Sequence, residues 1–275
     1  MTQKERAKAF STLHRAEKLF VLPNIWNVGS AVVFAKQGFP AIATSSAGVA
    51  YDMGYPDGED ITFGDLLDVV ERISKRVSVP LSVDFERGYA ETPEQVKENA
   101  RFLLEAGAVG FNIEDGFADG TLSKVPFQLE KLRALAELKA ETGIDFVINA
   151  RTCVCWYNTW GDMRASIADA IERINEYARV EGVNCVFVPG VFTLEEVKGL
   201  LRNIAAPLNI ILNNRSGRIS ELDKAGVRRL SVGSAPVRYV YHEAIKIATD
   251  LKNEKTHALL SNPFTYKEAQ KYFSE

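Results

Sequence analysis

Residues 109–116 read Val-Gly-Phe-Asn-Ile-Glu-Asp-Gly, a short apolar run that ends in two carboxylates and a glycine. A short run that is rich in β-branched or aromatic residues and bounded by polar or glycine residues is typical of a strand buried on both faces, as in a parallel sheet. The stretch therefore predicts one buried strand with acidic side chains at its carboxyl end.

The same pattern recurs along the whole chain. Similar runs lie at residues 19–22, 41–44, 81–83, 146–148, 185–188, 210–212 and 229–232. Between them, amphipathic helices are expected at residues 63–77, 93–106 and 129–140. Thr92 and Thr193, each with carboxylates shortly after it, have the pattern of helix N-caps.

Eight strands that alternate with helices in about 250 residues predict an α/β fold, a (β/α)8 TIM barrel. The segments before residue 19 and after residue 251 would form extra helices. An open, doubly wound sheet is the alternative arrangement.

Composition and charge favour one large domain over residues 1–275. The chain is 46% hydrophobic and carries a net charge of −3, which suits a single domain with a sizeable core. Lysine and arginine are scattered, so we expect neither nucleic acid nor a membrane surface as a partner.

The chain start and the cysteines indicate the compartment. Residues 1–8 are polar and charged, which predicts no secretory signal, and no apolar run approaches the roughly 20 residues of a membrane-spanning helix. Cys153, Cys155 and Cys185 are too few and too clustered for a disulfide framework, and their spacing does not suit a zinc site. We therefore expect a reduced, cytoplasmic protein.

Acidic residues crowd the carboxyl ends of the expected strands, where a barrel carries its active site. Asp84 and Glu86 follow the third strand, and Glu114 follows the fourth. Asp84 and Glu86 are two residues apart, so they would point the same way on a continuing strand. Three converging carboxylates repel one another unless a cation lies among them, and Mg²⁺ suits such ligands. The alternative is that Asp84 and Glu86 cap a helix or pair with Arg87.

Two other strand ends carry groups suited to an anion. Ser45, Ser46 and Ala47 form a small-residue turn whose N–H groups could cradle a carboxylate or phosphate, with a plain tight turn as the alternative. Arg151 ends the fifth strand, where a guanidinium is costly unless it meets an anion. That anion is either a substrate or one of the carboxylates, in a structural ion pair.

Histidine and cysteine are weak candidates for catalysis. His14, His242 and His257 lie in predicted helical or terminal segments, so surface or packing roles are expected. Cys153, two residues after Arg151, has the pattern of a small buried hydrophobic residue rather than of a nucleophile.

Five tracts form an ordered set along the chain. They are residues 40–50 (PAIATSSAGVA), 54–58 (GYPDG), 82–89 (SVDFERGY), 106–115 (AGAVGFNIED) and 148–152 (INART). Together they resemble the isocitrate lyase/phosphoenolpyruvate mutase superfamily, over residues 19 to 247 approximately. The resemblance implies a barrel whose last helix is exchanged with a neighbouring subunit, usually in a homotetramer built as a dimer of dimers. The apolar stretch at residues 237–251 fits such an exchange.

The resemblance also implies Mg²⁺ and a small carboxylate substrate with an α-oxo or α-hydroxy group. Matched position by position, Asp84 is the direct metal ligand. Glu86, Asp57 and Glu114 would hold the metal largely through waters, although Glu86 stands where the family usually has a second aspartate.

The same matching assigns the substrate contacts. Ser45 and the following amides of Ser46 and Ala47 would bind the substrate carboxylate, and Arg151 would steady charge on the reacting substrate. Mg²⁺ on an oxo oxygen would stabilise the enolate that forms when a bond to the adjacent carbon breaks.

Departures from the superfamily's patterns limit the reaction. The lyases carry Lys-x-Cys-Gly-His on a gating loop and the mutases carry Pro-Lys-x-Asn, and residues 116–124 (GFADGTLSK) match neither. Residues 188–190 (VPG) stand where lyases tend to have glutamate and mutases histidine. We expect a lyase that cleaves or forms a carbon–carbon bond through an enolate. Phosphorus–carbon chemistry and oxo-acid binding without turnover are the alternatives.

Overall fold

A parallel sheet of nine short strands forms a nearly closed barrel in the computed structural model, which describes residues 1–274. The strands are β1 (Phe20–Leu22), β2 (Asn24–Ile25), β3 (Ile42–Thr44), β4 (Leu81–Asp84), β5 (Gly110–Glu114), β6 (Val147–Arg151), β7 (Val183–Phe187), β8 (Leu208–Ile211) and β9 (Arg229–Ser231). Their hydrogen-bonded order is β1-β9-β8-β7-β6-β5-β4-β3-β2. The N-terminal segment thus borders both β9 and β3, and the TIM-barrel prediction is confirmed.

Pro23 explains why the barrel has nine strands although it has eight strand positions. β1 and β2 are separated only by Pro23, which has no N–H to donate to a sheet. β1 pairs with β9 and β2 pairs with β3, so the two pieces together act as the first strand of the barrel.

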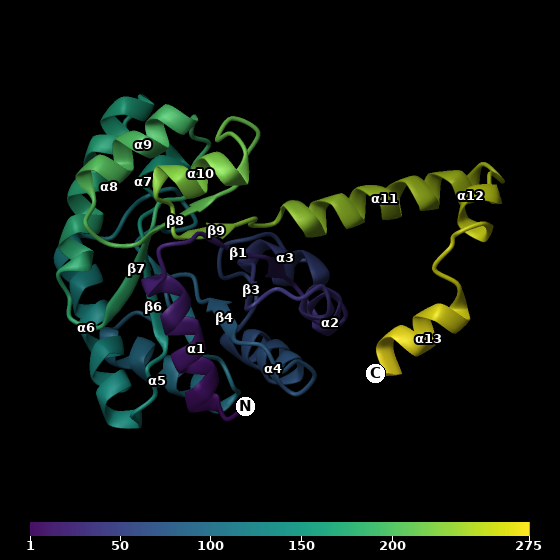
Figure 1. Cartoon of the computed structure of the whole chain (residues 1–275), viewed down its shortest axis with the longest axis horizontal. Coiled ribbons are helices and arrows are strands. Elements are labelled where there is room, and N and C mark those ends of the chain that lie inside the picture. Colours follow the sequence, from purple (N-terminus) through teal and green to yellow (C-terminus); the bar gives the residue numbers. More distant parts are fainter. Residues whose placement is uncertain (275) are drawn as a thin grey trace. The chain divides into compact units, whose positions relative to one another are not determined.

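Within residues 1–234, helices alternate with the strands and cover the barrel (Figure 1). Residues 1–274 form thirteen helices. They are α1 (Gln3–Arg15), α2 (Val28–Lys36), α3 (Ser46–Asp52), α4 (Phe63–Ser74), α5 (Pro93–Glu105), α6 (Val125–Thr142), α7 (Val154–Tyr157), α8 (Met163–Ala178), α9 (Leu194–Asn203), α10 (Ile219–Ala225), α11 (Ala235–Lys252), α12 (His257–Leu260) and α13 (Tyr266–Ser274). Thr92 caps α5 and Thr193 caps α9, as the sequence predicts.

Alternation along the strands separates the apolar core from a polar interior. Phe111 on β5 packs against Phe85 and Phe146, with ring centroids 5.7 and 5.3 Å away. Its neighbour Asn112 points to the opposite face, as the period of two requires, and contacts Asp84 there. The helices pack on the apolar face of the sheet, and the polar face lines the interior of the barrel.

Helix α1 closes the barrel at the amino ends of its strands. Phe10 reaches so far inside that a Cβ at Gly110 would lie 2.7 Å from its ring, and only glycine leaves that space. The buried His14 packs edge-on against Phe10 and Phe20, which confirms a packing role for this histidine.

The chain divides into two compact units, Met1–Ser234 and Ala235–Glu275. The first contains all nine strands, and the second contains α11, α12 and α13. None of the helices in residues 1–274 combines the length and apolar character needed to cross a membrane.

Candidate active site

A cavity of about 190 Å³ lies at the carboxyl ends of β4, β5 and β6. Its wall combines acidic, basic and aromatic side chains. The charged and aromatic residues that line it are Asp57, Glu59, Glu86, Arg87, Glu114, Arg151, Trp156 and Tyr157. This is the end of a barrel at which active sites are built.

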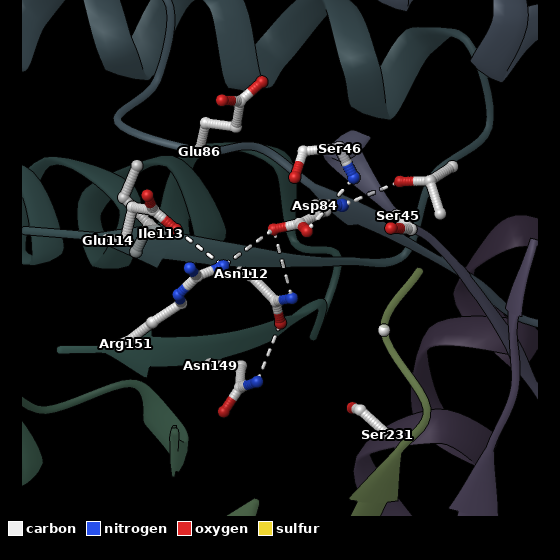
Figure 2. Close-up of polar contacts among 12 residues, drawn as sticks. Ser45, Ser46, Asp84, Glu86, Asn112, Ile113, Glu114, Asn149, Arg151 and Ser231 are labelled. Carbon is white, nitrogen blue, oxygen red and sulfur yellow. Dashed lines mark hydrogen bonds and ion pairs between the residues drawn. The ribbon is translucent and has the colours of Figure 1, made fainter. Parts of the chain in front are cut away.

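Strand register brings the predicted polar residues together. The parallel ladder places Glu114 beside Arg151, and Asp84 beside Asn112. Side chains at paired positions point to the same face, so a carboxylate, an amide and a guanidinium meet inside the barrel mouth (Figure 2).

Arg151 lies between two carboxylates. Its Nη1 is 2.7 Å from Glu114 Oε2 and 3.8 Å from Asp84 Oδ1. All three side chains are nearly buried. The structure therefore contains the ion pair that the sequence offers as one role for Arg151, in a place where a bound anion would meet the same guanidinium.

The prediction that Asp84 and Glu86 lie on one continuing strand is wrong. β4 ends at Asp84, and Glu86 adopts a left-handed backbone with φ of 48°, which is strained for a residue with a Cβ. Its Oε1 accepts a 2.6 Å hydrogen bond from the Tyr89 hydroxyl. Glu86 still lines the cavity, but the turn and not strand alternation sets its direction.

The turn after β3 is the start of helix α3. Ser45 is the N-cap, and its Oγ accepts from the Gly48 N–H at 3.2 Å. The Ser46 N–H donates to Asp84 Oδ2 at 3.2 Å. Ser46 lines the cavity, and Ala47 follows as a buried residue of α3. The predicted cradle is thus a helix N-terminus tied to Asp84.

The site holds several buried carboxylates close to one another, and a bound cation would stabilise their charged forms. Burial raises the pKa of Glu86 to about 9 and that of Glu114 to about 7, and it also raises the pKa of Asp57. Neighbouring carboxylates add to each shift. A positive ion beside them would favour their ionised forms.

An all-oxygen donor set fits Mg²⁺, which keeps several waters and takes one or two carboxylates directly. Within residues 1–274, no three acidic, histidine or cysteine side chains are gathered tightly enough to hold an ion as they stand. The assignment of Asp84 as the direct ligand, with water-mediated contacts from Asp57, Glu86 and Glu114, stays a prediction.

Sequence reasoning missed the polar residues behind the site. Asn112 Oδ1 accepts from Asn149 Nδ2 at 2.7 Å and from Arg229 Nη2 at 3.0 Å, and Asn112 Nδ2 donates to Asp84 at 3.3 Å. The signal was available, because Asn112 and Glu114 share one strand face, as do Asn149 and Arg151. Asn112, which Asn149 holds in place, thereby fixes the orientation of the Asp84 carboxylate.

A second group missed from the sequence surrounds the fully buried Asp115. Its carboxylate accepts from Thr152 Oγ1, the Cys153 N–H and the Tyr177 hydroxyl, each at 2.8 Å. The end of β5 is thereby bound to the segment that follows Arg151. Cys153 is buried in this contact, in agreement with the packing role expected for it.

Two loops meet beside the cavity. Arg87 pairs with Glu59 at 2.9 Å and places its guanidinium 4.6 Å from the centroid of the Phe117 ring. Ala118 approaches Gly58 so closely that an added Cβ there would lie 3.0 Å away. Arg87 thus joins the loop before α4 to residues 116–122, and it pairs with Glu59 rather than with Asp84 or Glu86.

Comparison with known proteins identifies the family. The model of the family described as phosphoenolpyruvate phosphomutase matches residues 10–252. A protein of Mycobacterium tuberculosis (strain H37Rv) with no assigned function is 32% identical over 228 residues, which cover 83% of each chain. An oxaloacetate decarboxylase of Rhodopseudomonas palustris (strain TIE-1) is 29% identical over 209 residues, which cover 73% of this chain and 69% of the other.

Solved structures share the fold of this chain. A protein of Burkholderia cenocepacia J2315, described provisionally as a lyase/mutase, superposes with a TM-score of 0.91 at 28% identity and covers 99% of this chain and 98% of its own. The fold is shared with 2,3-dimethylmalate lyase, a member of the PEP mutase/isocitrate lyase superfamily, at a TM-score of 0.85 and 20% identity over 97% of this chain and 94% of the other. The chain therefore belongs to the phosphoenolpyruvate phosphomutase family.

Proposed function

We propose that this chain is a magnesium-dependent lyase that cleaves or forms a carbon–carbon bond in a small 2-oxo- or 2-hydroxy-carboxylate through an enolate. The observation that supports this most is the meeting of Asp84, Glu114 and Arg151 beside a cavity of about 190 Å³ at the carboxyl ends of the strands. The relative named oxaloacetate decarboxylase supports a 2-oxo-carboxylate as the substrate class.

Each group in the site has a chemical task in this proposal. Arg151 would donate hydrogen bonds to the charge that develops on the substrate when the bond breaks, since it is a fixed cation in a buried position. Ser45, Ser46 and Ala47, at the start of α3, would hold a substrate carboxylate at the positive end of the helix, with the Ala47 N–H as a donor because the Ser46 N–H already binds Asp84.

Asp84, with Asp57, Glu86 and Glu114, would hold Mg²⁺, which supplies a positive charge that stabilises an enolate oxygen. The chain's own residues orient that charge, because Asn112 and the Ser46 N–H both hold the Asp84 carboxylate.

Assembly and location complete the proposal. We infer a homotetramer, a dimer of dimers, in which α11 is exchanged between subunits, and a cytoplasmic location. The free cysteines Cys153, Cys155 and Cys185 suit a reducing compartment.

Metal binding provides a direct test at Asp84. Calorimetric titration with Mg²⁺ in the presence of oxalate should show binding by the parent protein and none by Asp84→Ala, because Asp84 is the proposed direct ligand. Asp68→Asn is the matched control, since Asp68 lies exposed on α4. Equal Mg²⁺ binding by the parent and Asp84→Ala would reject the proposed metal site.

A screen tests the reaction. Oxaloacetate, citrate-like hydroxy acids and phosphonopyruvate are each incubated with the protein and Mg²⁺. Released pyruvate is measured, and with phosphonopyruvate the formation of phosphoenolpyruvate is measured as well. We expect turnover of an oxo or hydroxy acid. Turnover of phosphonopyruvate alone would assign phosphorus–carbon chemistry instead, and oxalate binding without any turnover would assign a binding protein.

A further inference from the structure

Tyr157 is part of the cavity wall. It is the last residue of α7 and lines the same cavity as Glu114 and Arg151. Its ring lies over the end of β5, where a Cβ on Gly116 would be only 2.8 Å from Tyr157 Cε2. Glycine at position 116 therefore makes room for this ring beside the carboxylates.

The position of Tyr157 is fixed by the structure before it. Asp115 binds Thr152 Oγ1 and the Cys153 N–H, and the Tyr157 N–H donates to the Cys153 carbonyl at 2.9 Å. The helix then ends at Asn158, which has a left-handed φ of 49°. A side chain held this way is preorganised for a reaction in the cavity.

Other cavity groups with exchangeable protons already have partners. Ser46 hydrogen-bonds Asp57, and Glu59 pairs with Arg87. Glu86 accepts from Tyr89, Glu114 pairs with Arg151, and a guanidinium does not give up its proton in a protein. Tyr157 differs in the kind of partner that it has, because its side chain hydrogen-bonds the buried Cys153 thiol, which is a weaker acceptor than a carboxylate.

We propose that Tyr157 is the catalytic acid that protonates the enolate carbon, an inference that rests on the proposed lyase function. In the cleavage of a 2-oxo dicarboxylate, the bond between C3 and C4 breaks, C4 leaves as carbon dioxide, and its electron pair forms the enolate of C2 and C3. The Tyr157 O–H then breaks, and its proton forms a C–H bond at C3. The phenolate that remains takes a proton from water.

The surroundings of Tyr157 suit both halves of this step. Burial raises the pKa of Tyr157, so that the phenol keeps its proton at neutral pH until the enolate forms. Arg151 acts in the opposite direction and would stabilise the phenolate afterwards. Proton transfer by a positioned side chain contributes about 10²–10⁴-fold to a rate.

Tyr157→Phe tests the role, because it removes one oxygen and keeps the ring that packs on Gly116. With oxaloacetate and Mg²⁺, we expect kcat to fall about 10²–10⁴-fold. The affinity for oxalate, an enolate mimic, should stay within about threefold of the parent. Tyr51→Phe, at the surface end of α3, is the matched control and should keep the parent kcat.

Stereochemistry gives a second readout that a structural role would not change. With 3-methyloxaloacetate in D₂O, the parent should place deuterium on one face of C3 and yield a single enantiomer. Tyr157→Phe should release the enolate to water and yield both enantiomers in any residual product.

Each outcome is decisive. A kcat of Tyr157→Phe within a few-fold of the parent, or a single enantiomer in its residual product, would overturn the acid role while the lyase function stands. No protein-dependent turnover of any oxo or hydroxy acid by the parent would overturn the proposed function and the acid role together.

Discussion

Arg151 is the residue at which a catalytic and a structural role can be separated. It lies 2.7 Å from Glu114 and 3.8 Å from Asp84, so its positive charge also offsets two buried carboxylates. Arg151→Lys keeps the charge but loses the planar two-pronged contact. We expect kcat to fall about 10²–10³-fold, with little change in Mg²⁺ binding. The measurement is kcat and melting temperature on the same preparation.

The control for this substitution is Arg72→Lys, which alters an exposed ion pair with Asp68 on α4. It should change neither quantity, because exposed pairs contribute little to stability. If Arg151→Lys keeps a kcat within a few-fold of the parent while its melting temperature falls, Arg151 serves the scaffold and the catalytic role is wrong.

The sequence identifies which residue types end the strands, but not how the strands pair. Asp84, Glu114 and Arg151 could be selected because each directly follows or ends an apolar run. Asn112 was missed although strand alternation places it on the same face as Glu114. Tyr157 could not be selected, since its position depends on the short helix after Arg151. The direction of the Glu86 side chain was predicted wrongly, because its left-handed φ depends on the turn and no sequence pattern indicates it.

At the scale of elements, helix α1 makes stability depend on pH through His14. Burial, with Arg229 nearby, lowers the pKa of His14 from 6.5 to about 3. Below about pH 6.5 the unfolded chain therefore binds a proton that the folded chain refuses, so the free energy of unfolding decreases as pH falls towards 3. Between pH 6.5 and 5 the loss is about 2 kcal/mol, at about 1.4 kcal/mol per pH unit.

His14→Phe isolates this effect, because a phenyl ring can keep the edge-on contacts with Phe10 and Phe20. The melting temperature of the parent should fall more between pH 7 and pH 5 than that of His14→Phe. The control His257→Gln changes an exposed histidine of α12 and should behave like the parent. Identical pH profiles for the parent and His14→Phe would show that His14 is not buried as a neutral group.

Element order was predictable because each buried strand is a separate apolar run between polar boundaries. All eight expected runs coincide with strands, and Thr92 and Thr193 mark helix starts. The short β2 was missed, since Asn24–Ile25 has no run of its own. It belongs to the sheet only because Pro23 interrupts the first barrel strand, and a proline in a sequence more often indicates the end of a strand.

At the scale of the whole molecule, α11 raises the question of assembly. Within this helix, Tyr239 and Ile245 are 69% and 66% exposed in the single chain. Val240, Ile247 and Leu251 of the same helix are exposed as well, and several exposed apolar side chains on one helix indicate an interaction surface. We expect light scattering at micromolar concentration to give about four times the 30.5 kDa of one chain, in agreement with the exchange of α11 that we propose.

A paired substitution on α11 distinguishes a specific interface from general adhesion. Tyr239→Asp combined with Ile245→Asp places two charges where apolar side chains would be buried between subunits, and burying an unpaired charge is costly. That variant should sediment as a smaller species, while Lys246→Asp, which changes a charge already exposed on the same helix, should keep the parent mass. A parent protein that stays monomeric at micromolar concentration would rule out the exchange. A tetramer that is unaffected by the paired substitution would place the interface on another part of the chain.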